Sequence, residues 1–524
     1  MARNTSARAP KSVLHQAVIF LGADAMSMMV CEARGEELRV LDVLSQPVEL
    51  ARDVFGSGHV SRDTMDRCVQ VAQGFCALLA EYGMSSGAEV RLLGSNILAD
   101  IRNMDTLVNR LQIACGLSLE VMDDGEMTRL LYLNVQSALE RHPELEKKRV
   151  LVVHVGPGNT RLLVSDKGRI TFYSNYRIGA HRTGIKLGES ALAEADDEAA
   201  LIREHIRGTV EQIGYDVESA LTAAPDAVML FGPDFRSVES PLMAENATAE
   251  RLSRLAKQIA SCPANRRGER YRETYASVCA LLPSVIIGLS IARFHEGASL
   301  LCPREEYAGA FLSQLMPSRR DDAVLEDEVI HFSQLLAARY RTDRGHGNHI
   351  RKLTMALFDR LQELHRLTRH DRLVLKVAAI LHEIGTFISP KNHHRHGQYI
   401  ILNSEIFGLS RLDVEVVGLL ARYHRHGAPT MSDTSYTELD LATRLRVQKL
   451  AALLRVAEAM ETAHSRRIQE FTVRFNNRRI ELLISGVHDF AQENRALRAK
   501  GALFTDIFGY ELILLPAEEG GGDK

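Results

Sequence analysis

One pattern occurs twice in the first half of the chain: a short apolar run, a glycine turn and a second apolar run. The first copy is Ala17-Val-Ile-Phe-Leu-Gly-Ala-Asp-Ala-Met-Ser-Met-Met-Val30, and the second is Leu151-Val-Val-His-Val-Gly-Pro-Gly-Asn-Thr-Arg-Leu-Leu-Val164. Apolar runs joined by a glycine turn predict β-hairpins. Two similar hairpins 134 residues apart predict two similar α/β lobes, with the boundary near Lys147.

Short β-rich runs and longer helical segments alternate through the rest of this half. The predicted strands are Ala17–Leu21, Ser27–Ala33, Leu38–Gln46, Val90–Gly94, Val150–Val155, Thr160–Ser165, Ala227–Phe231 and Ser299–Leu301. The predicted helices are Arg62–Tyr82, Asp105–Cys115, Gly125–Ala138, Asp197–Ala220 and Glu250–Ile259.

The pattern changes after Met316, because no β-rich run follows until the C-terminal end. Glu326–Thr462 is predicted to be almost entirely helical, with apolar residues three and four apart. Two strands near residues 471–484, a helix near Phe490–Ala502 and a last strand at Tyr510–Leu515 are predicted to form a small α+β end.

Composition excludes several classes of protein. At ~150 residues per domain, 524 residues predict three or four domains. The 45% apolar and 25% charged residues exclude a disordered, collagen-like or coiled-coil chain. The net charge is only -3, but Arg341–Glu470 holds 20 Lys and Arg against 14 Asp and Glu, and 11 of the 20 histidines. A basic, histidine-rich module suits an anionic ligand, although an ordinary fluctuation of surface charge would look the same.

Cysteine usage and the N-terminus predict a cytoplasmic protein. The seven cysteines lie between Cys31 and Cys302 without a C-x-x-C pair, and the N-terminal segment has no signal-peptide pattern. No run of ~18 apolar residues occurs, so we expect no segment to span a membrane. Zinc-finger spacing and an aromatic-interleaved basic stripe are missing, which argues against sequence-specific nucleic-acid binding but leaves contact with a long polyanion open.

The two glycine turns predict an anion site without a metal. Backbone N–H groups at such a turn approach phosphate, and a carboxylate ending the first strand would hold Mg2+. Phe20 and His154 end the two first strands instead, and Arg161 follows the second turn. The predicted phosphate-binding residues are Gly22, Gly156, Gly158, Asn159, Thr160, Arg161 and His154. A filled cleft with vestigial turns is the alternative.

Several segments resemble, in order and spacing, the exopolyphosphatase and guanosine pentaphosphate phosphatase family, Ppx/GppA. They are Gly94–Asn103, Asp124–Tyr132, the second hairpin and Ser174–Arg182, and the resemblance extends over about residues 15–515. It implies a two-lobed actin-like α/β fold of the sugar-kinase/Hsp70, ribonuclease H-like type, then an all-α HD-like domain and a small α+β subdomain. The implied segments are a disordered tail (1–14), lobe I (15–147), lobe II (148–318), the HD-like domain (322–466), the α+β subdomain (467–516) and a flexible tail (517–524).

The resemblance implies removal of terminal phosphate from polyphosphate or pentaphosphorylated guanosine, with a glutamate that positions water and Mg2+ that stabilises the leaving charge. This chain departs from that pattern, because the family's strand-end aspartates fall on Phe20 and His154 and its catalytic glutamate on Met127. A phosphate-binding arginine falls on Ala99, and a later phosphate loop reads Gly232-Pro-Asp. Glu126 remains, but its side chain would point about 100° away around the helix.

We therefore expect a Ppx/GppA-like protein that binds polyphosphate or a guanosine polyphosphate across the lobe cleft and the HD-like domain, with a degenerate, inactive phosphatase site. The first alternative is an active phosphoanhydride hydrolase that uses Glu126 or a metal in the HD-like domain. The second is a purely structural homodimer, since long family members pair through their C-terminal halves.

The histidine-rich region resembles the ligand order of HD phosphohydrolases. A first histidine, a His–acid pair and a distant acid are matched by His346, His382 with Glu383, and Glu458, which predicts Mg2+ or another divalent metal. Both acids are Glu rather than Asp, so each carboxylate would reach ~1.5 Å further. His394 and His424 belong to the same wider set, for which polyanion contact and structural networking stay open. His393, Arg395, His396, Arg422, Arg425 and His426 are predicted to be solvated and to form a phosphate-binding rim.

Overall fold

The computed structural model describes residues 14–34, 37–84, 90–188, 197–221, 223–232, 248–271, 275–295, 297–302, 312–313, 315, 319–425 and 427–517. The predicted tails at 1–13 and 518–524, Pro233 and Asp234 of the later phosphate loop, and His426 lie outside these residues. The chain divides into two compact units, residues 1–322 and 323–524.

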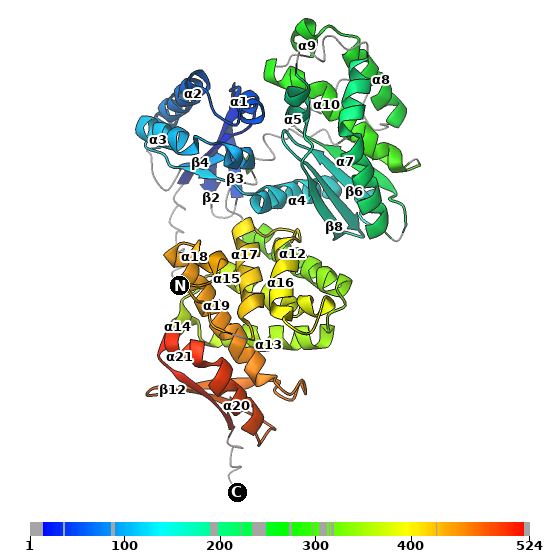
Figure 1. Cartoon of the computed structure of the whole chain (residues 1–524). Coiled ribbons are helices and arrows are strands. Elements are labelled where there is room, and N and C mark those ends of the chain that lie inside the picture. Colours follow the sequence, from blue (N-terminus) through cyan, green and yellow to red (C-terminus); the bar gives the residue numbers. More distant parts are fainter. Residues whose placement is uncertain are drawn as a thin grey trace, which may run out of the picture. The chain divides into compact units, whose positions relative to one another are not determined.

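The first sheet of the N-terminal unit has the strand order β3-β2-β1-β4-β5. Its strands are β1 (Leu14–Leu21), β2 (Ala25–Arg34), β3 (Glu37–Pro47), β4 (Val90–Gly94) and β5 (Leu119–Val121). β1, β2 and β3 are antiparallel, whereas β4 and β5 run parallel to β1. Alternate residues of β1, such as Ile19, pack with α2 (Arg62–Glu81) and α3 (Met104–Cys115), seen beside the sheet in Figure 1.

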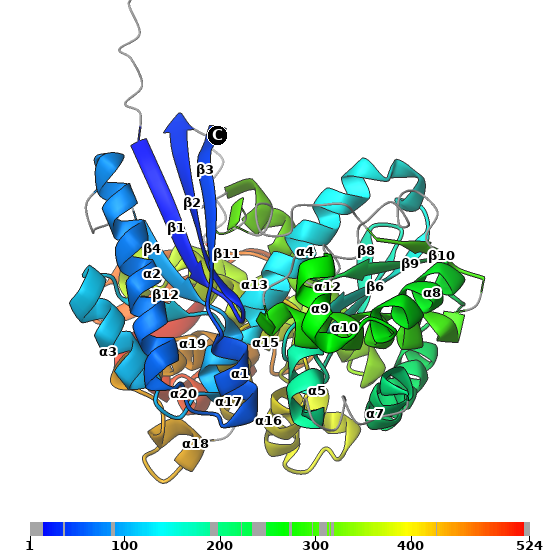
Figure 2. The ribbon, with the colours of Figure 1, turned by 90° about the horizontal axis from the view of Figure 1, so that it is seen from above.

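The second sheet repeats this arrangement, with the order β10-β9-β6-β7-β8. Its strands are β6 (Arg149–Val155), β7 (Thr160–Asp166), β8 (Arg169–Tyr176), β9 (Ala227–Phe231) and β10 (Ser299–Leu301). β6, β7 and β8 are again antiparallel, and β9 and β10 run parallel to β6. The same order and directions in both sheets, viewed from above in Figure 2, confirm two similar lobes of the actin-like type.

Helices complete both lobes. The remaining helices of this unit are α1 (Leu50–Gly56), η1 (Asn96–Asp100), α4 (Asp124–Arg141), η2 (Pro143–Leu145), α5 (Ala180–Leu187), α7 (Glu198–Ala220), α8 (Ala249–Ala260), α9 (Ala264–Tyr271), α10 (Tyr275–Ala292) and η4 (Arg293–His295). The core of the second lobe joins β6, β7 and β9 to α7, α8 and α10.

One segment, Val278–His295, is long and apolar enough to cross a membrane by length and composition. The expectation that nothing spans a membrane stays a prediction. Of this window, 72% is buried inside the structure, and α10 packs against α5, α7 and α8. That environment is the one expected for the central helix of a globular lobe, which is apolar all round because it has no solvent face.

The C-terminal unit is mainly helical, as predicted. Its helices are α12 (Arg319–Arg339, which begins just before the unit boundary), α13 (Arg344–Arg360), α14 (Gln362–His365), α15 (Arg369–Leu381), η5 (Ile384–Phe387), α16 (His393–Leu402), α17 (Arg411–Tyr423), α18 (Thr434–Thr437) and α19 (Leu441–Met460). Side-chain caps set several starts: Thr368, Ser410 and Asp440 each accept a bond from the backbone N–H three residues later.

A small α+β segment ends this unit, also as predicted. It contains β11 (Phe471–Asn476), β12 (Arg479–Ile484), α20 (Ala491–Lys500), α21 (Ala502–Phe508) and β13 (Glu511–Pro516). β12 is central, antiparallel to β11 and parallel to β13. α20 and α21 pack against α19, and this contact joins the segment to the helices before it.

Candidate functional site

The first glycine turn joins β1 to β2 and carries an acidic residue. The N–H of Gly22 donates to the carbonyl of Ala25 at 2.9 Å, which closes the turn. Asp24 lies at its tip, and Asp24 Oδ1 is 2.7 Å from Nε2 of His181, a side chain that is only 1% exposed. The carboxylate nearest this turn is therefore already engaged by a buried imidazole.

The second glycine turn, residues 156–159, is tightly packed. A Cβ on Gly158 would lie 2.9 Å from the ring of Phe55, and one on Gly179 would come closer than 3.0 Å to the backbone of the turn. The Thr160 hydroxyl is buried and donates to the carbonyl of Ile178 at 2.7 Å. Within the described residues, the N–H groups of Gly158 and Asn159 have no acceptor, so they are the groups of this turn left for an anion.

The two predicted cationic residues face each other on β6 and β7. Arg161 Nη2 lies 2.6 Å from Asp124 Oδ1, with the arginine side chain 4% exposed, so its charge is balanced internally. Burial, together with the Arg161 guanidinium, lowers the pKa of His154 to about 3. His154 is therefore neutral at physiological pH and Arg161 is paired with Asp124, so neither of these predicted phosphate-binding side chains offers a free positive charge.

An apolar cluster occupies the face of the first sheet opposite α2 and α3. Phe20 packs against it from β1, and Met127 enters it from α4. Its buried members are Val18, Met29, Cys31, Leu93, Met122, Met127, Leu130, Leu312 and Leu315. Glu126 points elsewhere: its carboxylate accepts the N–H of Asp123 at 3.0 Å in a capping box that starts α4.

Two arginines that sequence reasoning did not single out lie beside the second turn. Arg182 Nε donates to the carbonyl of Gly158 at 2.9 Å, and its guanidinium lies over the Phe55 ring, 4.8 Å from the centroid. Arg182 and the exposed Arg177 both approach Asp100 Oδ2, at 3.3 and 3.5 Å. Two cations thus share one carboxylate. The only sequence signal for them was the Ser174–Arg182 segment.

A second constellation is buried in the helical unit. His346 on α13 and His382 at the end of α15 approach the same oxygen, Glu458 Oε1 on α19, at 3.4 and 2.9 Å. Glu383 presents a carboxylate oxygen within 4.8 Å of both rings. The four predicted ligands are therefore brought together, and the longer glutamate side chain of Glu458 reaches both imidazoles directly.

The electrostatics of this constellation are dominated by Glu458. Burial alone would lower the pKa of His382, but the carboxylate of Glu458 raises it overall. Burial alone would raise the pKa of Glu458, but His382 and His346 hold it well below its usual value. The cluster thus contains a buried carboxylate stabilised by two imidazoles.

Two further histidines extend the cluster. His424 is 1% exposed and lies beside the His382 ring, with 5.1 Å between ring centroids, and its Nε2 is 3.2 Å from His393 Nε2. The expectation that His393 is solvated is wrong: it is 4% exposed, because its ring turns inward from the first turn of α16. Arg395 and Arg425 are exposed, as predicted, whereas Arg422 is bound to Asp433 at 2.7 Å.

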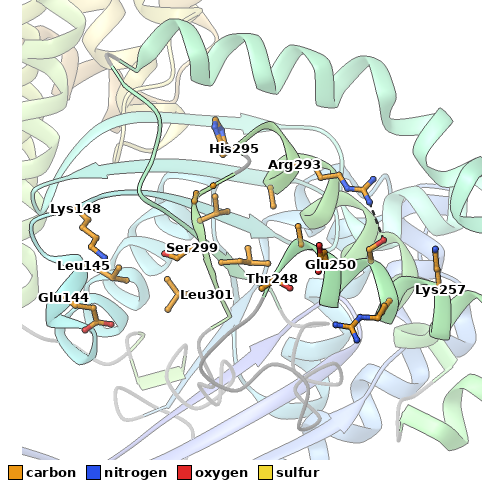
Figure 3. Close-up of a pocket in the computed structure, with 18 residues that line it drawn as sticks. Glu144, Leu145, Lys148, Thr248, Glu250, Lys257, Arg293, His295, Ser299 and Leu301 are labelled. Atoms are coloured by element: carbon orange, nitrogen blue, oxygen red, sulfur yellow. Dashed lines mark hydrogen bonds between the residues drawn. The ribbon is translucent and has the colours of Figure 1, made fainter.

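A cavity of about 1270 Å3 opens elsewhere in the second lobe, between β9, β10 and α8. Figure 3 shows Lys148 and Glu144 at one end of it and Lys257 and Arg293 at the other. No predicted site residue lines this cavity. Its basic side chains, among them Lys148 and Lys257, alternate with the acidic Glu144 and Glu250.

Comparison with known proteins decides the family. The family model for Ppx/GppA phosphatases matches residues 29–280, and the model for domain III of the same family matches residues 332–500. The chain belongs to the Ppx/GppA phosphatase family. Among similar proteins is the guanosine-5'-triphosphate,3'-diphosphate pyrophosphatase of Aeromonas salmonicida, 24% identical over 420 residues, which cover 77% of this chain and 79% of the relative.

Two further similar proteins are a second relative of the same name and a solved structure. The Vibrio vulnificus protein of the same name is 24% identical over 461 residues, covering 84% of this chain and 86% of that protein. Among solved structures, an exopolyphosphatase from Cytophaga hutchinsonii matches with a TM-score of 0.49 and 15% identity, over 57% of this chain and 97% of that one.

The Mg2+ that the Ppx/GppA resemblance implies does not fit the residues at the glycine turns. Mg2+ requires oxygen ligands in near-octahedral geometry. Asp24, at the tip of the first turn, and Asp124, the partner of Arg161, are held by His181 and Arg161. In the described part of the chain, three metal-ligating side chains come together only at His346, His382 and Glu383, in domain III.

Proposed function

We propose that this Ppx/GppA family member binds polyphosphate or a guanosine polyphosphate at the glycine turns and does not hydrolyse it. The observation that carries the proposal is the apolar cluster shared by Phe20 and Met127, which stand where the resemblance places an aspartate and the catalytic glutamate. Loss of a general base lowers the rate by about 10²–10⁴-fold, and loss of the metal removes several kcal/mol more of transition-state stabilisation.

Ligand binding is supported by the backbone N–H groups of the second turn and by the arginines beside it. The N–H groups of Gly158 and Asn159 have no backbone acceptor among the described residues, and backbone N–H groups of glycine turns are groups that can bind phosphate. Arg182 and Arg177 lie beside it and exceed the single shared carboxylate of Asp100 by one positive charge. The names of the relatives specify guanosine 5'-triphosphate 3'-diphosphate, a highly negative ligand of the kind that two arginines would bind.

The binding test is a titration of polyphosphate and guanosine pentaphosphate into the full-length chain by calorimetry at low and moderate salt. We expect Arg177→Gln, at a largely exposed side chain, and Arg182→Gln to weaken binding severalfold. Arg293→Gln, in the separate cavity of the second lobe, is the matched control and should leave affinity unchanged. Equal losses in all three variants would indicate diffuse electrostatic contact and contradict a site at the turn.

A second candidate function is hydrolysis, which the printed names of the relatives favour. Glu126 is the acid that the sequence analysis considered for this role in the lobes, and desolvation of its carboxylate is the main reason that its pKa is raised. Its engagement in the capping box argues against a role as general base. Phosphate release that disappears in Glu126→Gln would establish this candidate, and release that disappears in His382→Ala would place the reaction in domain III.

The homodimer and the cytoplasmic location stay predictions. The structure assigns no disulfide bond to the cysteines of the described residues, which suits a reducing compartment. Sedimentation of the full-length chain at micromolar concentration distinguishes a monomer from a dimer.

A further inference from the structure

Asp100 of the first lobe lies against two arginines of the second lobe. It belongs to η1, which follows β4, and its Oδ2 is 3.3 Å from Arg182 Nη2 and 3.5 Å from Arg177 Nη2. Arg177 follows β8 directly, and Arg182 lies on α5. These two arginines are the cations that the proposed function assigns to the ligand. An internal carboxylate therefore occupies the donors that a ligand phosphate would use.

Contacts with both lobes fix Arg182 beside the second glycine turn. Its Nε donates to the carbonyl of Gly158 at 2.9 Å, and its guanidinium lies over the ring of Phe55 from α1. Only 16% of the Arg182 side chain is exposed. The Nη2 atom that faces Asp100 also lies 3.6 Å from the position of a Cβ on Gly158. The donor that Asp100 occupies is therefore adjacent to the turn.

The contact between Asp100 and the arginines is weak enough to be exchanged. Half of the Asp100 side chain and 74% of the Arg177 side chain are exposed, so water screens their charges. Both separations exceed the ~2.7–2.9 Å of a strong charge-assisted hydrogen bond. Arginine binds phosphate through short and often bidentate bonds of that kind. A phosphate can therefore displace the carboxylate, but only at a cost to its own affinity.

The neighbouring position removes a positive charge from the same segment. Ala99 stands where the family resemblance places a phosphate-binding arginine, and Asp100 follows it directly. These two positions thus lack the expected positive charge and carry a negative one. Both features lower the affinity of this part of the first lobe for an anion, because like charges repel.

We propose that Asp100 is an internal competitor of the ligand. This inference rests on the proposed function, because it concerns the same arginines. A ligand phosphate binds Arg177 and Arg182 by displacing the carboxylate, which also removes one contact between the two lobes. The displacement lowers the affinity for every phosphate ligand by the same factor. A polyphosphorylated ligand overcomes this loss through additional contacts with the turn, whereas a single phosphate has too few contacts to do so.

The test is a calorimetric titration of polyphosphate, and separately of orthophosphate, into the full-length chain at one moderate salt concentration. We expect Asp100→Asn to bind polyphosphate severalfold more tightly than the unaltered chain, because both arginines are then free of the carboxylate. Orthophosphate binding should also become stronger in this variant but stay far weaker than polyphosphate binding. Melting temperatures measured before the titrations show whether each variant is folded.

Three further variants separate competition for the arginines from a general effect of charge. Asp100→Glu keeps a carboxylate and should keep the affinity of the unaltered chain. Asp105→Asn is the matched control, because it removes the same charge at an exposed position in the first turn of α3. In Arg177→Gln, the gain from Asp100→Asn should be smaller, because the carboxylate has lost one of its two partners.

Each possible outcome decides the inference. Equal polyphosphate affinities of the unaltered chain and Asp100→Asn would overturn the internal competitor and leave the proposed function standing. An equal gain in Asp100→Asn and Asp105→Asn would also overturn it, because only net charge would then matter. Polyphosphate binding that appears only in Asp100→Asn would support a strong competitor. No binding by the unaltered chain, Asp100→Asn or Asp105→Asn would overturn the proposed function and this inference with it.

Discussion

Replacing Met127 with glutamate tests the apolar cluster in a quantitative way. Met127 is 9% exposed, and its neighbours in the cluster are apolar side chains and Cys31. A carboxyl group buried without a partner has its pKa raised by up to about 3–5 units, so it stays protonated at pH 7. Starting from an unfolded pKa of ~4.3, this protonation at pH 7 costs about 4 kcal/mol of folding free energy, at ~1.4 kcal/mol per unit.

The sign of the pH dependence follows from linkage. The folded pKa of the new glutamate lies above its unfolded value, so Met127→Glu loses stability as the pH rises from ~4.3 towards the folded pKa. Relative to the unaltered chain, we expect a loss of about 4 kcal/mol at pH 7 and about 1 kcal/mol at pH 5, plus a pH-independent packing loss. Urea unfolding at the two pH values measures both.

Two control variants distinguish the effect of the buried carboxyl group on stability from the effect of lost packing. Met127→Gln should show the packing loss without the pH dependence, and Met127→Leu should change stability by less than about 1.5 kcal/mol. A Met127→Glu chain as stable as the original at pH 5 and pH 7 would mean that this position faces water. Together with new Mg2+-dependent phosphate release, that result would refute the interpretation of the cluster as a filled site.

Three further predictions concern other parts of the chain. The folded pKa of His154, about 3, lies below the ordinary value for histidine. The folding free energy of the unaltered chain should therefore fall by ~1.4 kcal/mol per pH unit as the pH drops below ~6.5. Urea unfolding of His154→Gln should not show this loss. Gly179→Ala forces a Cβ against the backbone of the second turn, so it should destabilise the lobe by about 1–3 kcal/mol and abolish polyphosphate binding. Gly208→Ala, on an open helix surface, is the control and should stabilise the lobe by about 0.5–1 kcal/mol. Equal effects of the two variants on stability would contradict the close packing at Gly179. Gly385→Ala forces a Cβ against the carbonyl of His393 and the backbone of Gly397, so urea unfolding should show a loss of about 1–3 kcal/mol in the helical unit, and an unchanged stability would contradict this close approach.

The elements that the sequence predicted are those with a strong local pattern. The twin hairpins alternate or run apolar over six or more residues, and all eight strands predicted in the first half exist. The sequence analysis did not predict β5, because three residues are too few to show the two-residue alternation of a strand. It did not predict β8, because buried and exposed residues do not alternate regularly along that strand. α10 was missed because it is apolar on all sides and contains Pro283, so neither amphipathicity nor composition separated it from a strand-rich segment.

The candidate site, like the fold, was predicted only in part from the sequence. Departures at Phe20, His154 and Met127 are visible in the residues themselves, because a residue type either can or cannot hold Mg2+ or accept a proton. That Arg161 is neutralised by Asp124, 37 residues away along the chain, depends on tertiary contacts that no local pattern encodes. The burial of His393 could not be predicted for the same reason. Its basic neighbours fit an exposed loop as well as the buried start of a helix, and only tertiary contacts decide between the two.

The most direct test of the central claim is orthophosphate release under binding conditions. The full-length chain is saturated with polyphosphate or guanosine pentaphosphate in the presence of Mg2+, binding is confirmed by calorimetry in the same buffer, and released phosphate is counted per chain over many hours. The account predicts saturable binding with no release above that of a ligand-only control. Mg2+-dependent turnover by the unaltered chain would contradict it.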